Sequence, residues 1–172
     1  MNVTARCYRA HDPSWSFSPT SGEGARIRGG RFNVKGTATL YLTFAIETAV
    51  AEWLQSLSPR LEPMTICEYD VDCDDILDLT DPAVCKDAGI DPNDLACGWL
   101  SYQLRGEIAP SQKIAQDSID RGAAGIIVPS FAPGASKGAK NLVLWSWGNN
   151  RPHKVMVYDP NARLPKDRSS WS

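Results

Sequence analysis

The chain has 172 residues, a formal net charge of −2 and an apolar content of 42%. These values are typical of one globular domain spanning residues 1–172, and they exclude a disordered or membrane chain. The slight acidic excess argues against nucleic acid as a direct partner, because phosphate binding normally requires a basic surface. No apolar run approaches the roughly 20 residues of a membrane span. The first residues also lack the apolar stretch of a secretory signal, so we expect a cytoplasmic location and no membrane partner.

The cysteines and histidines do not form a metal-binding pattern. The five cysteines are odd in number and none has CxxC spacing, which favours reduced thiols that are buried or incidental. His11 and His153 lack ligand-type neighbours at zinc spacing. The run Asp70-x-Asp72-x-Asp74 resembles the start of a calcium loop but lacks the glycine and the bidentate glutamate that complete one. We therefore predict no metal cofactor and a solvated acidic loop over residues 70–78.

The N-terminal part is predicted to be a short strand at 5–9 and then a long ordered loop to residue 37, anchored by Trp15 and Phe17. Within this loop, Gly29 and Gly30 permit positive φ angles and a close backbone approach to a ligand. Arg31 on such a turn presents a rigid donor fork suited to phosphate or carboxylate. The alternative is an arginine that caps a surface turn.

Residues 38–43 alternate as in a half-buried strand, with Leu40 and Leu42 toward the core and Tyr41 on the other side. The tyrosine ring can then stack on a flat heterocycle in a cleft. A structural strand tyrosine is the alternative.

A helix is predicted at 45–57, where apolar residues recur at three- and four-residue steps. Its expected buried face consists of Ile46, Ala49, Val50, Trp53, Leu54 and Leu57. Glu52 borders this face beside small residues, whereas Glu47 lies on the opposite flank and should face solvent. A carboxylate at position 52 can stabilise positive charge on a sugar carbon, as cleavage of a nicotinamide–ribose bond requires. A solvated helix glutamate is the alternative.

The remainder mixes helices and strands without a regular βαβ rhythm, which predicts an α+β fold. The expected strands are 64–71, 124–128, 142–147 and 154–158, and the expected helices are 96–104 and 111–121. Ser130 follows one strand and has neither a neighbouring histidine nor a GxSxG turn. It is therefore interpreted as a hydrogen-bonding partner of a ligand, with turn capping as the alternative.

Together these segments resemble the RES-domain family of bacterial toxins. The resemblance rests on seven motifs in the expected order: Tyr8-Arg9-Ala10-His11, Gly29-Gly30-Arg31-Phe32-Asn33, Leu40-Tyr41-Leu42, Glu47-Thr48-Ala49-Val50-Ala51-Glu52, Asp78-Leu79-Thr80-Asp81-Pro82, Ile127-Val128-Pro129-Ser130 and Asn141-Leu142-Val143-Leu144-Trp145. Each motif is weak alone, and their order and spacing over most of the chain make the match specific.

The resemblance implies a single domain of mixed β-sheets and flanking helices, similar to ADP-ribosyltransferases, with NAD in a cleft. By analogy Arg31 holds the ribose-phosphate part of NAD, Tyr41 stacks on nicotinamide, and Glu52 stabilises the oxocarbenium ion or orients the acceptor. Gly30, Asn33 and Ser130 complete the pocket. The loop 131–140 carries no arginine, so Arg9 is expected to contact phosphate if the first strand pairs beside the Tyr41 strand.

The resemblance further implies a toxin of a type II toxin–antitoxin system whose antitoxin carries a helix-turn-helix part and covers the active-site entrance. We expect transfer of ADP-ribose to a cellular protein, partly because the long loop and six tryptophans could form a docking surface. Water or phosphate as acceptor, which would deplete NAD as a glycohydrolase or phosphorylase does, is the alternative. A non-catalytic ligand-binding or interaction module is a third reading, against which intact Arg31, Tyr41 and Glu52 argue.

Overall fold

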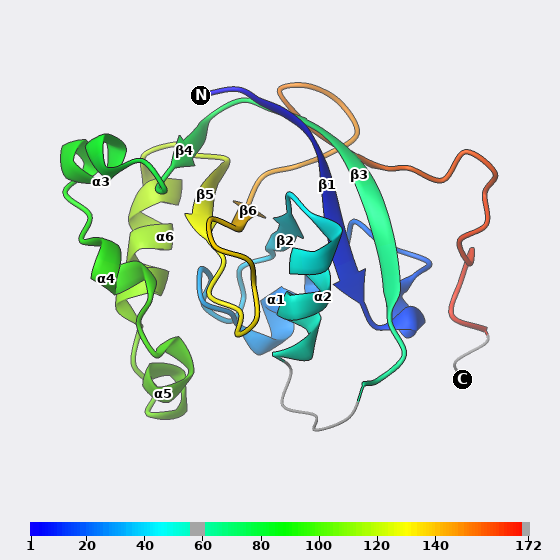
Figure 1. The fold of residues 1–172 in the computed structure, drawn as a ribbon, viewed down its shortest axis with the longest axis horizontal. Helices are drawn as coiled ribbons and strands as arrows, with labels where there is room; N and C mark the ends of the chain where they lie inside the picture. The colour runs from blue at the N-terminus through cyan, green and yellow to red at the C-terminus, as the bar shows by residue number, and fades with distance from the viewer. Residues whose placement is uncertain (56–60, 170–172) are drawn as a thin grey trace.

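One seven-stranded sheet organises the part of the chain that the structure, a computed structural model, describes, residues 1–55 and 61–169. The strands run in the order β4-β5-β6-β2-β1-β3-β7 (Figure 1). They comprise β1 (Val3–His11), β2 (Leu40–Thr43), β3 (Thr65–Cys73), β4 (Ile76–Asp78), β5 (Gly125–Pro129), β6 (Lys140–Leu144) and β7 (His153–Val157). Only β4 and β5 pair in parallel; the other neighbours are antiparallel. The α+β prediction is confirmed, with one mixed sheet where several were expected.

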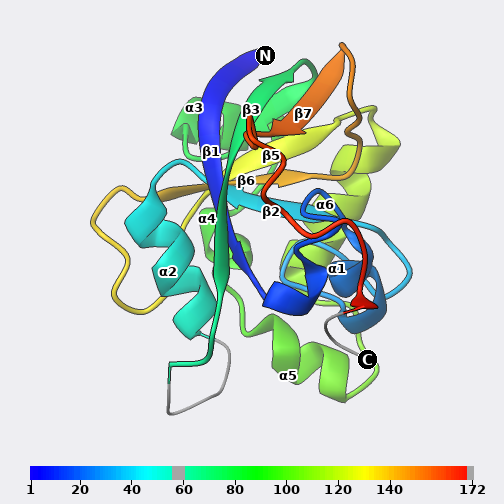
Figure 2. The ribbon, with the colours of Figure 1, turned by 90° about the vertical axis from the view of Figure 1, so that its right-hand side faces the viewer.

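The helices lie on both faces and at one edge of this sheet. They are η1 (Pro13–Trp15), α1 (Glu23–Arg28), α2 (Ile46–Leu54), α3 (Pro82–Ala88), α4 (Pro92–Leu95), α5 (Trp99–Leu104) and α6 (Pro110–Asp120). Helices α3 to α6 gather beside β4 and β5 (Figure 1). Strands β1 and β3 run between α2 and the segment that carries α1 (Figure 2). None of the helices in the described residues is long and apolar enough to cross a membrane.

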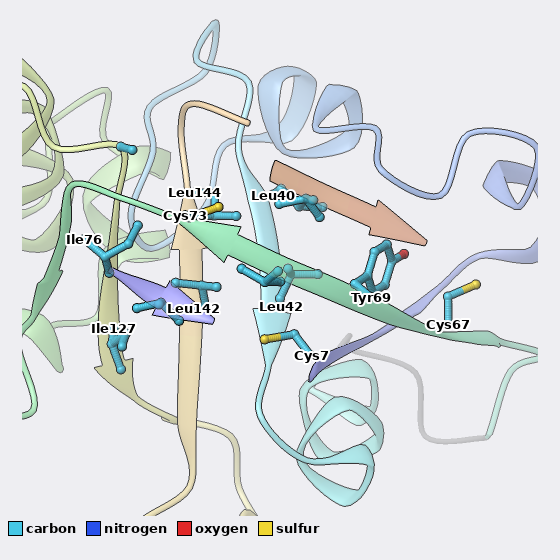
Figure 3. Close-up of a cluster of buried hydrophobic side chains, with 14 residues drawn as sticks. Cys7, Leu40, Leu42, Cys67, Tyr69, Cys73, Ile76, Ile127, Leu142 and Leu144 are labelled. Carbon is cyan, nitrogen blue, oxygen red and sulfur yellow. The ribbon is translucent and has the colours of Figure 1, made fainter. Parts of the chain in front are cut away.

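Alternation along the strands separates two hydrophobic cores. Leu40 and Leu42 lie in the first core with Cys7 and Tyr69 (Figure 3), and both leucines are completely buried. Tyr41, between them in sequence, packs against the second core, which β5, β6 and helices α3, α4 and α6 supply. Successive side chains of a strand point to opposite faces, so the predicted orientation of Tyr41 is confirmed. Both faces of β2 are therefore covered.

The long N-terminal segment is ordered, as predicted, and it contains helix α1, which the sequence analysis missed. Side chains of the sheet and of the segment after β6 hold its backbone. The Trp147 indole donates to Thr20 O at 3.0 Å, and the Tyr69 hydroxyl donates to Pro19 O at 2.8 Å. A short helix of six residues leaves too little apolar periodicity to detect in such a segment.

Helix α2 forms where predicted, and the expected buried face is correct at Ala49 but wrong at Ile46 and Leu54. Ile46 and Leu54 are 49% and 52% exposed, while Thr48, Ala49 and Ala51 are buried. Small side chains allow the helix axis to approach the sheet closely, and this turns the larger residues outward. Leu57, the last residue of the predicted stripe, lies outside the described residues.

The acidic stretch is not the solvated loop that the composition suggested. Asp70 and Asp72 belong to β3, and the stretch ends in the short strand β4. The Arg151 guanidinium donates to Asp72 Oδ2 at 2.6 Å and to Asp74 Oδ2 at 2.9 Å. These carboxylates thus pair with a cation of the β6–β7 connection. No group of three or more metal-ligating side chains gathers among residues 1–55 and 61–169.

Candidate active site around Glu52

The Glu52 carboxylate is the centre of a side-chain network that joins three distant segments. The Ser130 hydroxyl donates to Glu52 Oε1 at 2.7 Å, and the Asn141 amide donates to the same oxygen at 2.5 Å. The Gln55 amide, one helical turn further along α2, donates to Oε2. The network fixes the position of both carboxylate oxygens. Glu47, by contrast, is exposed in the first turn of α2, as predicted.

Sheet register brings Ser130 and Asn141 to this carboxylate. Ser130 directly follows β5, where the chain leaves the sheet. Asn141 lies in β6 opposite Thr43 of β2, and so on the face from which Tyr41 projects. Ser130 was predicted from the sequence as a ligand-binding residue, whereas Asn141 appeared only as part of a motif. The available signal was alternation: Asn141 is polar and precedes Leu142 and Leu144, which point to the other face and are buried.

The Tyr41 hydroxyl is fixed by the turn that carries Arg31. It donates to Asn33 Oδ1 at 2.7 Å and accepts from the Phe32 N–H at 3.1 Å. Asn33 is only 2% exposed, and its amide donates to three backbone carbonyls, including Ala25 O at 2.9 Å. Burial raises the pKa of Tyr41 well above its ordinary value, although the Phe32 hydrogen bond and the Arg31 charge oppose this shift. Tyr41 is therefore neutral, with a rigidly held ring.

The two glycines before Arg31 have different roles. Gly29 adopts a positive φ of 75°, as predicted. Gly30 does not, and its requirement is space: a Cβ there would lie 2.6 Å from the Tyr41 hydroxyl oxygen and 2.7 Å from Asn33 Oδ1. The Gly30 backbone was expected to lie close to a ligand, and in the structure it lies close to the Tyr41–Asn33 pair.

Arg31 is held between the α4–α5 connection and the segment after β5. Its Nη1 donates to Cys97 O at 2.5 Å and to Leu95 O at 3.2 Å, and the guanidinium lies 4.6 Å from the centre of the Phe131 ring. Burial lowers the pKa of Arg31, and the neighbouring Cys97, Glu52 and Tyr41 groups act in the opposite direction. The structure therefore brings the three predicted catalytic residues within electrostatic range of one another.

Arg9 lies apart from this group. Strand β1 does pair beside β2, with Tyr8 opposite Thr43, but alternation turns Arg9 to the face opposite Tyr41. There its Nη1 donates to Ser21 O at 2.9 Å and to Pro19 O at 3.0 Å. The structure does not bring Arg9 to Arg31, and a role for it in binding NAD stays a prediction.

The tryptophans do not form the exposed docking surface that their number suggested. The five within the described residues are all half-buried, and Trp171 lies outside them. Trp145 donates to Phe32 O at 3.0 Å, which ties the Arg31 turn to the end of β6. The five cysteines are free and four of them are buried, as predicted.

A family model for the RES domain matches residues 6–167. The chain belongs to the RES-domain family. No curated protein matches it. A chain in the crystal structure of the M. tuberculosis MbcT–MbcA toxin–antitoxin complex is similar in fold, with a TM-score of 0.63 at 22% identity over 92% of this chain and 84% of that chain.

In this RES domain, a fixed carboxylate, a guanidinium and a neutral tyrosine ring occupy one side of the sheet. A carboxylate held by three donors keeps its position while charge changes beside it, and so stabilises a developing cation. A guanidinium attracts phosphate oxygens. The set suits a substrate that carries both a phosphate and a carbon becoming positively charged.

Proposed function

We propose that this RES domain is the NAD-consuming toxin of a toxin–antitoxin system and cleaves the bond between nicotinamide and ribose. The observation that carries the proposal is the Glu52 carboxylate held by Ser130, Asn141 and Gln55 within electrostatic range of Arg31 and Tyr41. As nicotinamide leaves, positive charge develops on the ribose carbon and a carboxylate beside it lowers the barrier.

The other residues have complementary roles in this proposal. Arg31 attracts the phosphates of NAD, and the Tyr41 ring stacks on nicotinamide while its hydroxyl stays bonded to Asn33. Ser130 and Asn141 keep Glu52 oriented during the reaction. The Phe131 ring lies against the Arg31 guanidinium, and two backbone carbonyls accept hydrogen bonds from its Nη1. A guanidinium has five N–H donors, so these contacts leave other donors of Arg31 for a phosphate.

We further propose that ADP-ribose passes to a side chain of a cellular protein. The half-buried tryptophans weaken the docking argument from composition, so the family resemblance is the main support. Transfer to water or phosphate shares the same bond cleavage and differs only in acceptor. The partner proposed is a cognate antitoxin, by analogy with the neighbour that was solved as a toxin–antitoxin complex; a helix-turn-helix part and coverage of the site entrance follow from the resemblance.

Incubation of the purified chain with NAD labelled on its adenylate part tests both levels of the proposal. Release of nicotinamide together with label on a lysate protein is expected. If nicotinamide is released without lysate and no lysate protein is labelled, the chain degrades NAD and does not transfer ADP-ribose to a protein. A requirement for phosphate in that reaction would identify a phosphorylase. The absence of nicotinamide under all conditions would overturn the enzymatic proposal.

A further inference from the structure

One amide at the candidate site has a buried oxygen without a partner. Among residues 1–55 and 61–169, three buried side-chain atoms lack a hydrogen-bond partner: His11 Nδ1, Gln103 Oε1 and Asn141 Oδ1. Of these, only Asn141 contacts the Glu52 carboxylate. Buried polar atoms in native proteins are almost always satisfied, so an exception at a functional site points to a missing partner.

The orientation of the Asn141 amide is fixed by its neighbour. Its nitrogen donates to Glu52 Oε1. The reversed amide would place its oxygen against a carboxylate oxygen, and two acceptors repel each other. The unpartnered atom is therefore the amide oxygen, which accepts a hydrogen bond and cannot donate one.

The side chains of the network supply no donor to this oxygen. The carboxylate of Glu52 only accepts, the single hydroxyl proton of Ser130 is donated to Glu52, and the Gln55 amide donates to Glu52 Oε2 and not to Asn141 Oδ1. A buried acceptor without a hydrogen bond costs free energy, and a donor brought in by a ligand would remove this penalty. A ligand that carries a hydrogen-bond donor beside the Glu52 carboxylate would therefore satisfy Asn141 Oδ1.

We propose that Asn141 Oδ1 accepts a hydrogen bond from a hydroxyl of the nicotinamide-side ribose, which makes Asn141 a specificity-determining residue. This inference rests on the function proposed above. The amide that carries Oδ1 also holds Glu52, so a group bonded to Oδ1 lies next to the carboxylate and to the ribose carbon that loses nicotinamide. The hydroxyls of that ribose are the donors nearest to this carbon. Because solvent does not reach Oδ1, its contact with the ribose requires a small turn of the Asn141 amide.

Binding of carbocyclic NAD, which cannot be cleaved, provides the test by calorimetry. Two further analogues lack either the 2-hydroxyl or the 3-hydroxyl of the same ring. The unaltered protein should bind one of these analogues about 3- to 10-fold more weakly than the parent, as expected for one neutral hydrogen bond. Asn141→Leu should bind the parent more weakly by a similar factor and should no longer distinguish that analogue.

Ser130→Ala is the matched control, because it removes the other donor to Glu52 Oε1 and leaves Asn141 Oδ1 in place. Ser130→Ala should still distinguish carbocyclic NAD from the analogue that lacks the hydroxyl, whereas Asn141→Leu should not. If both variants acted only by displacing Glu52, they would not differ in this way. Equal discrimination in Asn141→Leu and the unaltered protein, or none in either, would overturn the inference. Failure of the folded, unaltered protein to bind the parent would instead contradict the proposed function. Asn141→Ala replaces Asn141→Leu if the latter does not fold.

Discussion

The two faces of the central sheet both bury polar side chains, but they use them differently. Under α2, Glu52 is bonded by the side chains of Ser130, Asn141 and Gln55. Under the N-terminal segment, Arg9 and Tyr69 donate to backbone carbonyls of residues 19 and 21. The first face thus fixes a charged group in place, whereas the second fixes a stretch of backbone.

This difference indicates where function is to be sought. Side-chain-to-backbone bonds of a buried guanidinium secure a loop that the hydrophobic core alone would leave loose. Side-chain bonds that converge on an ionised carboxylate offer little net stability, because the carboxylate must be desolvated. Such a network is expected where the carboxylate itself is needed. We therefore expect changes on the α2 face to affect turnover and changes on the opposite face to affect stability.

The largest effect is expected for Glu52→Gln. Loss of the negative charge beside the reacting carbon should reduce nicotinamide release by about 10³-fold. The amide has nearly the same shape, so the melting temperature should change little. Glu47→Gln, on the exposed flank of the same helix, is the control and should keep full activity. A Glu52→Gln protein that releases nicotinamide at the normal rate would contradict the assignment of turnover to the α2 face.

Arg9→Met tests the opposite face. The carbonyls of Pro19 and Ser21 lose their charged donor, so the free energy of unfolding should fall by about 2–4 kcal/mol in urea titrations. Arg6→Met is the control on the same strand: Arg6 is exposed and lies 3.8 Å from Glu68, and its loss should cost less than about 1 kcal/mol. A fall in NAD affinity of the folded Arg9→Met protein would show that Arg9 also reaches the ligand, as predicted from the lack of an arginine in the loop 131–140.

The stability of the second face should depend on pH through His11. Burial, together with the charge of Arg9, lowers the pKa of His11 from 6.5 to about 4, and Asp12 opposes this shift. Between these values the unfolded chain binds more protons than the folded one, so stability falls as pH decreases from about 6.5 to 4. The expected loss is about 2–3 kcal/mol. His11→Gln should remove this part of the pH dependence, and the difference between the two proteins eliminates the contribution of carboxylates. An unchanged slope would refute the assignment.

Tyr41→Phe should have the smallest effect and separates the ring from its hydroxyl. Asn33 Oδ1 and the Phe32 N–H lose their shared partner, which should lower the free energy of unfolding by about 1–2 kcal/mol. If the ring stacks on nicotinamide, the affinity for carbocyclic NAD should stay within about threefold. Tyr41→Ala removes the ring and should weaken binding more strongly. Equal affinities of the two variants would argue against stacking.

The strand pattern predicted more of this molecule than the helix pattern did. Alternation around Tyr41 placed its two faces correctly, because a strand allows only two side-chain directions. The predicted buried face of α2 was wrong at Ile46 and Leu54, which satisfy helical spacing but are exposed, and it missed small Ala51, which is buried. Apolar periodicity cannot tell which of two adjoining stripes approaches a partner.

Short helices and long-range contacts were beyond the sequence for different reasons. Helices α3 and α4 begin with an aspartate cap followed by proline, at Asp81-Pro82 and Asp91-Pro92, but are too short to show a period. The motif order predicted Arg31, Tyr41, Glu52 and Ser130 as site residues, and the structure places Ser130 on Glu52. The contact of Asn141 with Glu52 spans 89 residues and depends on sheet register, which no local pattern encodes.

The distance in sequence between Glu52 and its partners has a consequence during protein synthesis. Glu52 leaves the ribosome long before Ser130 and Asn141, which lie 78 and 89 residues further along. A nascent chain that ends before Ser130 holds the carboxylate with Gln55 alone and without the two donors to Oε1. The proposed chemistry therefore becomes possible only after β6 has joined the sheet. Unfinished chains, released by a stalled ribosome, would be harmless to the cell that makes them.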